Sequence, residues 1–416
     1  MEARILALLI ISSGVLITSQ QNQGPCYVSR DVGDEYRSSL YEYSIDLIKS
    51  VIVKSDFNYV CSLVSIWISL AAIAEGTGPV SQQKLFQFLK LPNDPCIRQE
   101  YYKMATTRAF PFNDVHIKNR RVLVLDESVT LNPTWYSFIT KNSLLDVVTA
   151  PIHSNPVATA KEIQRIMSTS LPRLNLNGNS VLLDTLDYNG LWTTTFLNAT
   201  IERAPFYSLT GQEIGSVDLM KIKKRARMGY LRSLHSKILE LPIGLSGRYH
   251  MLFLVRLGNN DLRPLVEDFG SSVLFEAFES LRHSNVLIDV AIPRIVITTE
   301  IDVRVILEEL GVTEVWNDPL VTRYILLDIN MPFICKHRYI SNPGALPSSF
   351  VQRTTVFLNN EGLASEDPSP SITRSGLDPE LGTDFIADRP FLFGLVDAET
   401  RTWLLTAAFT KPTYSQ

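Results

Sequence analysis

Two long β-rich runs constrain the fold of this chain more than any other feature. In residues 249–257 and 286–297 the apolar side chains are nearly continuous and do not alternate with polar ones. A strand with this pattern is typically buried on both faces, so we expect both runs in the middle of a covered sheet. Shorter strand-like segments are found at residues 121–125, 180–186, 391–395 and 403–409.

Helical periodicity dominates the first part of the chain. Apolar residues recur at three- and four-residue steps at Tyr36, Leu40, Tyr43, Leu47 and Val51, which predicts a long amphipathic helix. Residues 66–74 are apolar on most sides and predict a buried helix, and residues 301–310 predict a helix that Gly311 ends. Because helices dominate early and strands late, the fold class is α+β.

The N-terminus has the pattern of a secretory signal peptide. Residues 5–11 carry no charge, small and apolar residues continue to Ser19, and polar residues follow. We therefore expect residues 1–19 to be removed from a secreted, extracellular protein. The alternative is a single membrane anchor, but the run is shorter than the ~20 residues that a span needs. No later window is long and apolar enough to cross a bilayer, so we expect no membrane partner.

Secretion permits disulfides and glycosylation. Four cysteines, Cys26, Cys61, Cys96 and Cys335, allow three full pairings. Cys61 lies in an apolar stretch, which favours a buried free thiol. Asn198 begins the Asn-Ala-Thr sequon and is the expected glycosylation site.

Several kinds of chemistry are excluded by what the chain lacks. A net charge of −4 and a pI of about 5.9 do not fit a nucleic-acid binder. None of the six histidines pairs with another at metal-ligand spacing, so we expect no metal and no cofactor. Residues 244–247 are one residue short of the G-x-S-x-G motif of hydrolases. Nothing in the sequence supports an enzyme.

One basic cluster stands out, formed by Lys221, Lys223, Lys224, Arg225 and Arg227. It predicts either a polyanion site, such as one for a sulfated glycan, or a solvated strand or turn. We favour the solvated strand because no second basic segment lies nearby in the sequence.

Residues 361–388 break the regular pattern. They contain three prolines and few apolar residues and show no periodicity, which predicts an exposed loop. Loops this long are usually functional or disordered. A loop placed just before the last strands favours one large domain, residues 20–416, that displays it.

The chain resembles the serpins through six motifs in the family's order. Residues 58–66 (NYVCSLVSI) are similar to the start of its second helix, and residues 189–192 (NGLW) to its tryptophan segment. Residues 239–242 and 251–254 match the strands that follow, and residues 292–312 its P-K-F stretch. Residues 385–393 (FIADRPFLF) are the most specific match.

The resemblance implies one domain of three β-sheets, about nine helices and an exposed reactive-centre loop. In inhibitory serpins a serine protease cleaves this loop, which then inserts into the main sheet and distorts the trapped enzyme. It therefore implies an extracellular serine protease as partner, and we expect the protein to be a monomer. Arg374 is the only cation of the loop and suits a trypsin-like protease, so the bait is Arg374, Ser375 and Gly376. Some serpins tie their N-terminal arm to the region of Cys96, so Cys26–Cys96 is the expected disulfide.

The hinge of the loop departs from the family. Glu361 and Gly362 match, but Leu363 stands where a small residue is usual. In an inserted strand either Glu366 or Asp367 would face the core, at a cost of several kcal/mol. Pro368 and Pro370, which lack an N–H, are disfavoured in a central strand. We expect trapping to be impaired.

The buried polar cluster beneath the sheet opening, known as the shutter, also departs from the family. Ser62 and Ser65 are kept, but Gln352 replaces the usual histidine and Asp184 the usual asparagine. Leu63 replaces a proline, and residues 323–347, with Cys335, are extra. The main interpretation is a protease-directed serpin, and the alternative is a non-inhibitory carrier, binding or signalling protein.

Overall fold

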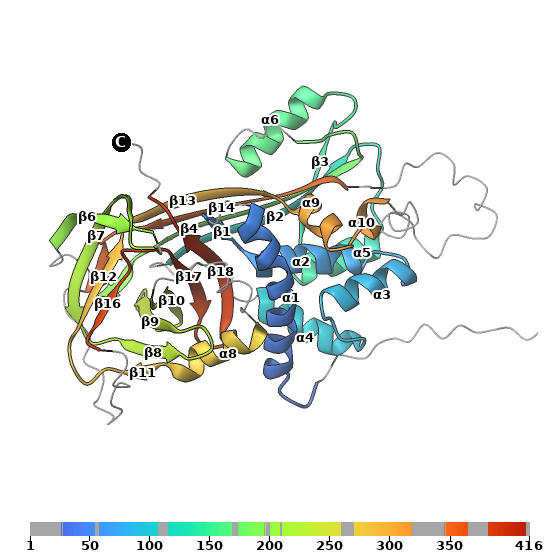
Figure 1. Cartoon of the computed structure of the whole chain (residues 1–416). Helices are drawn as coiled ribbons and strands as arrows, with labels where there is room; N and C mark the ends of the chain where they lie inside the picture. Colours follow the sequence, from blue (N-terminus) through green and yellow to red (C-terminus); the bar gives the residue numbers. More distant parts are fainter. Residues whose placement is uncertain are drawn as a thin grey trace, which may run out of the picture.

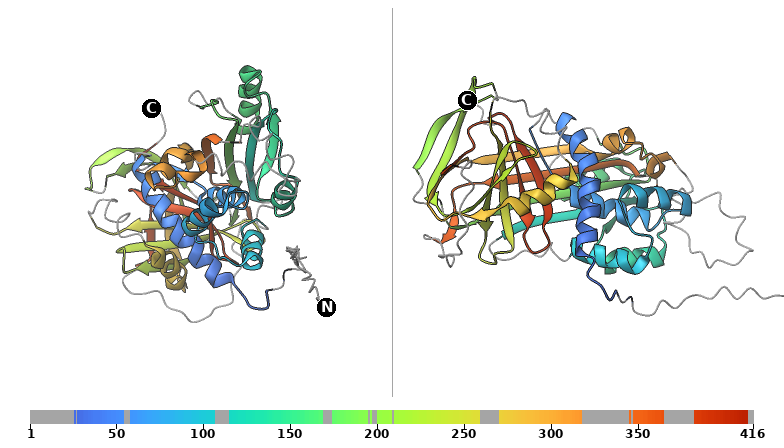
Figure 2. Two further views of the ribbon diagram at one scale, coloured as in Figure 1. Left: turned by 90° about the vertical axis from the view of Figure 1, so that its right-hand side faces the viewer. Right: turned by 60° about the horizontal axis from the view of Figure 1, so that its bottom comes forward.

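The computed structural model describes residues 26, 28–54, 58–106, 115–168, 174–194, 196, 200–208, 210–258, 270–317, 345, 347–364 and 382–412. Long strands run along the molecule, with helix α6 on one side of them and helices α1 and α2 on the other (Figure 1). Helices α2 to α5 lie at one end of the molecule, and strands β6 and β7 lie at the opposite end (Figure 2, right).

The main sheet has five strands in the order β13-β14-β4-β2-β3. Its members are β13 (Ile295–Asp302), β14 (Pro347–Leu358), β4 (Ser180–Gly190), β2 (Val115–Asp126) and β3 (Asp146–Ala150). Strands β14 and β4, in the middle of the sheet, are parallel. Helix α6 (Pro156–Met167) packs on one face, where Ile163 and Met167 share a core cluster with Val122 and Val181. This sheet positions the candidate site.

Two further sheets complete the core. The larger follows the order β1-β18-β17-β10-β9-β5-β15, with β8 (Arg227–Leu231) beside β9 and β11 (Arg282–His283) beside β8. Its path comprises β1 (Tyr59–Cys61), β18 (Thr402–Phe409), β17 (Phe391–Asp397), β10 (Tyr249–Arg256), β9 (Ser236–Ile243), β5 (Trp192–Thr194) and β15 (Gly362–Ala364). The smaller sheet comprises β16 (Asp384–Ile386), β12 (Ile288–Pro293), β7 (Glu213–Lys224) and β6 (Thr200–Tyr207). The predicted α+β class with three sheets is confirmed.

The remaining helices pack around these sheets. They are α1 (Gly33–Lys54), α2 (Leu63–Ala74), α3 (Pro79–Phe88), α4 (Pro95–Thr106), α5 (Pro133–Lys141), α8 (Ser271–Ser280), α9 (Val303–Glu309) and α10 (Glu314–Asn317). Every residue of α2 is buried, and the Ser62 hydroxyl caps its N-terminus by accepting from the Ser65 N–H at 3.3 Å. None of the helices described has the length and apolarity to cross a membrane.

One predicted strand is two strands. Residues 286–297 divide at Arg294, so that β12 belongs to the smallest sheet and β13 to the main sheet. Pro293 cannot donate to a ladder, and the Arg294 N–H donates to the Asp218 carbonyl at 2.9 Å, where the chain changes sheets. β13 is an edge strand with alternating burial, so the expectation that the whole run lies mid-sheet is wrong there. It is correct for β10, which lies between β9 and β17.

The predicted helices are confirmed with small changes at their ends. The helix expected at residues 301–310 begins at Val303 because Ile301 still pairs with Gln352 in the main sheet. Asp302 then caps the helix by accepting from the Val305 N–H at 3.4 Å. Gly311 follows with a φ of +80°, a left-handed conformation that suits glycine at a helix end.

Candidate functional site

The seam between β14 and β4 is closed. The two strands pair directly from Phe350 opposite Leu182 to Phe357 opposite Asn189. Neighbouring strands lie about 4.8 Å apart, so a new strand can enter here only if this ladder separates by one strand width. In inhibitory serpins the cleaved loop inserts into the main sheet, and the resemblance predicts insertion at this seam.

The predicted hinge lies beside a different sheet. Gly362 and Ala364 of β15 pair in parallel with Trp192 and Thr194 of β5. The Glu361 carbonyl accepts from the Trp192 N–H at 3.1 Å, and the side chain of Leu363 is exposed. The chain thus leaves the main sheet after β14 and carries the start of the loop away from the seam.

The four shutter residues lie together beneath the seam, and all four are fully buried. Gln352 Oε1 accepts a hydrogen bond from the Ser62 N–H at 2.9 Å, and Gln352 Nε2 donates one to the Ser62 carbonyl at 2.9 Å. The Ser62 hydroxyl donates to the Leu404 carbonyl at 2.7 Å, which joins the cluster to β18 of the second sheet. Glutamine therefore links β14 to the start of α2 by both ends of its amide.

Asp184 completes this cluster from β4. Its carboxylate accepts from Gln352 Nε2 at 2.7 Å and from the Ser65 hydroxyl at 2.8 Å. Burial raises the pKa of Asp184 from 3.8 to about 6, although Gln352, the Arg121 charge and Ser65 act in the opposite direction. A group that titrates near neutral pH therefore lies at the closed seam.

Other predicted residues fall outside the described ranges. These are the bait Arg374, Ser375 and Gly376, the hinge residues Glu366, Asp367, Pro368 and Pro370, the sequon Asn198, and Cys335 in the extra segment.

Cys26 and Cys96 form a disulfide, and Cys61 is a buried thiol whose pKa burial raises to about 12. In the part of the chain described, no three His, Cys, Asp or Glu side chains group to hold a metal.

The basic cluster divides into two parts. Lys221 and Lys223 on β7 form ion pairs with Glu202 at 2.5 Å and with Asp289 at 3.2 Å. Lys224, Arg225 and Arg227 instead line a pocket together with Glu240, His250 and His283. Sequence reasoning missed this pocket because its residues come from strands that are distant in the sequence.

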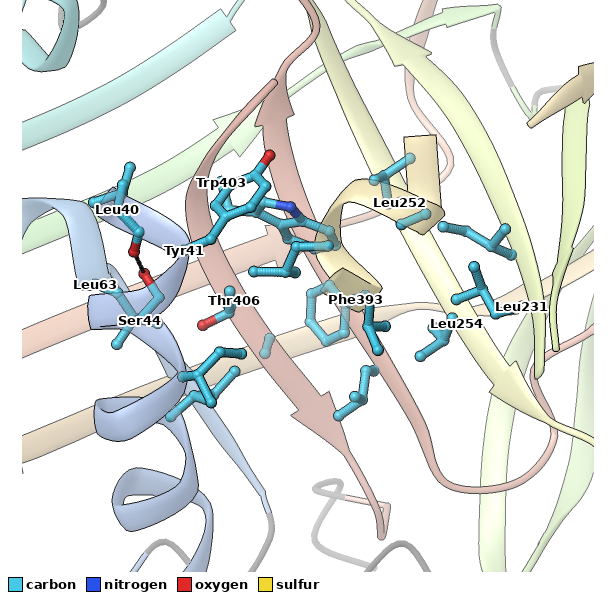
Figure 3. A pocket seen from close by; sticks show the side chains of 18 of the residues that line it. Leu40, Tyr41, Ser44, Leu63, Leu231, Leu252, Leu254, Phe393, Trp403 and Thr406 are labelled. Carbon is cyan, nitrogen blue, oxygen red and sulfur yellow. Dashed lines mark hydrogen bonds between the residues drawn. The ribbon is translucent and has the colours of Figure 1, made fainter. Parts of the chain in front are cut away.

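A second hollow lies between α1, α8 and the strands of the second sheet (Figure 3). Its lining is almost wholly apolar, with Trp403 and Phe393 at its centre and Leu252 and Leu254 to one side. The Ser44 hydroxyl at its edge donates to the Leu40 carbonyl at 2.6 Å. The cavity volume is about 40 Å³, which is room for a few waters and far below that of a pocket for a drug-sized ligand.

Comparison with known proteins agrees with this geometry. The family model described as "Serpin (serine protease inhibitor)" matches residues 38–412. Serpin B5 of Xenopus tropicalis is 21% identical over 401 residues, 91% of this chain and 99% of that relative. The structure of mouse protein-Z dependent protease inhibitor has a TM-score of 0.74 at 14% identity and covers 92% of this chain and 98% of its own. Human thyroxine-binding globulin complexed with thyroxine has a TM-score of 0.75 at 14% identity, covering 92% and 100%.

The family match, the order of the motifs and the five-stranded main sheet with its hinge outside the seam agree with one another. Serpins are in general protease inhibitors and not enzymes. This chain belongs to the serpin family.

Proposed function

We propose that this serpin is a secreted regulator of extracellular serine proteases that offers the bond between Arg374 and Ser375 to a trypsin-like enzyme. We further propose that its trapping step is impaired. The observation that carries the proposal is the position of the hinge: Gly362 and Ala364 pair with β5 while the β14–β4 ladder is closed. The start of the loop therefore lies outside the main sheet, as is required of a loop that a protease can reach.

Impaired trapping is supported by the residues that insertion would bury. An inserted strand would replace the β14–β4 ladder with a ladder on each side, but it would break the hydrogen bond from Gln352 to Asp184 that crosses the seam. The inserted segment would then bring Pro368, Pro370 and one carboxylate into a central strand. An inhibitory serpin gains free energy at this step, whereas here the penalties oppose it.

The extracellular location is inferred from the sequence. The pattern of residues 1–19 supports secretion, and the sequon at Asn198 is consistent with it. We expect a monomer. The basic cluster of Lys221, Lys223, Lys224, Arg225 and Arg227 is a candidate site for a sulfated glycan.

The test is an incubation with trypsin followed by a denaturing gel. The expected result is cleavage after Arg374 into two fragments, without a complex that survives detergent. Arg374→Ala should prevent that cut and serves as the control. A detergent-stable complex would overturn impaired trapping, and trypsin cleavage elsewhere with an intact Arg374–Ser375 bond would overturn the bait.

The carrier alternative gains nothing from the apolar hollow. At about 40 Å³ it does not admit a ligand of ordinary size unless side chains of α1 and α8 move. The likeness to thyroxine-binding globulin is a likeness of fold.

A further inference from the structure

His250 has a hydrogen-bond acceptor in front of each of its ring nitrogens. Nδ1 lies 2.6 Å from Glu240 Oε1, and Nε2 lies 3.0 Å from the Gly247 carbonyl oxygen. A carbonyl oxygen and an ionised carboxylate can only accept, so both ring nitrogens must carry a hydrogen to make both bonds. A neutral imidazole has one N–H, whereas the charged imidazolium has two. The geometry around His250 therefore fits the charged ring.

Glu240 supplies the negative charge that this ring needs. Its side chain is buried, and its second carboxylate oxygen accepts from Arg227 Nη1 at 2.5 Å. Burial acts to raise the pKa of Glu240, but His250 and Arg227 outweigh it and hold the pKa below its ordinary value. The carboxylate is therefore ionised at neutral pH. It fixes Nδ1 of His250 as a donor whether the ring is charged or neutral.

Other ionisable groups surround the ring. Glu240, in direct contact, favours the second proton, and the positive groups that line the same pocket act against it. The ionisable groups of that lining, besides Glu240 and His250, are Lys224, Arg225, Arg227 and a second imidazole, His283. Strand β5 contributes only uncharged residues to the lining. On the side of β17, Asp397 forms an ion pair with Arg248 at 2.9 Å.

The contact with Gly247 fastens the turn between β9 and β10. Residues 245–247 of this turn are exposed, so packing holds them only weakly. When the ring loses one proton, Nδ1 keeps its hydrogen for Glu240, and Nε2 presents a lone pair to the Gly247 carbonyl. Two acceptors cannot form a hydrogen bond, so the turn loses its attachment to the ring.

The same turn holds strand β5. The Gly244 N–H donates to the Leu191 carbonyl at 2.9 Å, just before β5 begins. The Thr193 hydroxyl of β5 donates to the Gly244 carbonyl. Gly244 is three residues from Gly247, so a movement of the turn reaches both of these bonds.

Strand β5 in turn holds the hinge of the loop. The Trp192 N–H donates to the Glu361 carbonyl at 3.1 Å, and the Trp192 indole N–H donates to the Asn359 carbonyl at 2.7 Å. Gly362 is also in register with Trp192. Hydrogen bonds therefore connect His250 to the hinge through the turn and β5.

We propose that His250 is a proton-dependent switch: its charged ring fixes the β9–β10 turn and, through β5, the hinge of the loop. Histidine is the side chain whose charge ordinarily changes between about pH 5 and 8. Both ring contacts are complete at the acid end of this range, and the contact with Gly247 is lost as the pH rises. The switch acts in the intact protein and depends neither on the bait nor on impaired trapping, so it can be tested separately from the proposed function.

Hydrogen exchange of backbone amides at pH 6 and pH 8, corrected for intrinsic exchange rates, measures the switch. The protection of the Gly244 and Trp192 amides is expected to fall about tenfold at pH 8, the size of one lost hydrogen bond. In His250→Gln, which has no titrating ring, the fall should be about fivefold smaller. Asp184 also titrates, with a pKa of about 6, but its contribution is common to both proteins.

His283→Gln is the matched control, because it removes the other imidazole of the pocket and leaves the turn untouched. It should keep the full fall in protection. Equal protection of the natural protein at both pH values would overturn the switch, and so would an equal fall in His250→Gln. A fall at Gly244 without one at Trp192 would overturn the link to the hinge.

The charge of the ring is measured directly by ¹⁵N NMR of the histidine side chains. The signals of His250 are those that disappear in His250→Gln. Both ring nitrogens should carry a proton at pH 6, and only Nδ1 should carry one at pH 8. A ring with the same protons at both pH values, or a neutral ring with its proton on Nε2, would overturn the proposal.

Discussion

Gln352 Nε2 donates a hydrogen bond of 2.7 Å to Asp184 Oδ2 across the seam between β14 and β4, and both side chains are fully buried. These residues are in register, so this contact joins the two strands that loop insertion would separate. One partner is a carboxyl group with a pKa of about 6. The stability of the closed sheet is therefore expected to depend on pH.

The first prediction is that Asp184→Asn stabilises the protein at pH 7.5 and has a smaller effect near pH 4.5. The pKa of Asp184 is raised from 3.8 to about 6 in the folded state. The stabilisation that its protonation provides is therefore complete below pH 4 and is lost as the pH rises through 6. Ionisation costs on the order of 3 kcal/mol at pH 7.5, which asparagine avoids. An amide can still accept from Gln352 and donate to Ser65.

Urea unfolding at both pH values measures this difference. Asp187→Asn is the matched control because Asp187 lies on the same strand with its side chain 42% exposed. Destabilisation by Asp184→Asn of equal size at both pH values would contradict the buried titration.

The second prediction concerns the other partner. Gln352→Leu removes all three hydrogen bonds of the side-chain amide. The Ser62 N–H, the Ser62 carbonyl and the Asp184 carboxylate each lose that partner inside the buried core. We expect a loss of about 3–5 kcal/mol in the free energy of unfolding. Hydrogen exchange of the β14 and β4 amides should become faster, since the seam opens more often. Protection that is unchanged at the seam but reduced elsewhere would argue against this role.

The third prediction is that the disulfide between Cys26 and Cys96 persists in the secreted protein. It closes a separation of 70 residues, so the chain-entropy model gives up to about 4 kcal/mol. Cys96→Ser should lower the melting temperature and release Cys26 to alkylation. Cys335→Ser is the control and should release no other thiol. Non-reducing peptide mapping that joins Cys335 to Cys26 or Cys96 would refute the pairing.

The fourth prediction is that Asn198 carries a glycan after secretion from eukaryotic cells. Asn198→Gln should increase gel mobility by the amount that enzymatic deglycosylation removes. Thr200→Ala destroys the same sequon and should reproduce the shift. Equal mobility of all three proteins would mean that the sequon is not used.

The sequence predicted the elements whose pattern is local. Helix α2 was predictable because nearly every residue of residues 66–74 is apolar. The grouping of the four shutter residues followed from the resemblance to serpins and not from any local pattern. The division of residues 286–297 was not, because the run is apolar on both sides of Arg294 and only the partners of Pro293 and Arg294 reveal the change of sheet. The cavity lined by Arg227, Glu240 and His250 was not predictable either. Its network joins Arg227, Glu240 and His250 through strand register, and periodicity carries no information on register between distant strands.

The last prediction is that cleavage at Arg374 gives little or no rise in melting temperature. Inhibitory serpins become more stable when the cleaved loop enters the main sheet. Here the two prolines each cost about 1–3 kcal/mol in lost ladder hydrogen bonds, and a buried carboxylate adds several more. Insertion must also break the contact between Gln352 and Asp184.

A small-residue hinge should restore part of the rise. The variant has Leu363→Thr with alanine at residues 365–370, so that the carboxylates and both prolines are removed together. Its control is alanine at Ser369 and Ser371 only, which leaves the penalties in place. Differential scanning calorimetry before and after trypsin treatment compares the three proteins. If the natural protein melts far higher once cut, its strand does insert, and full inhibition replaces impaired trapping as the function of this serpin.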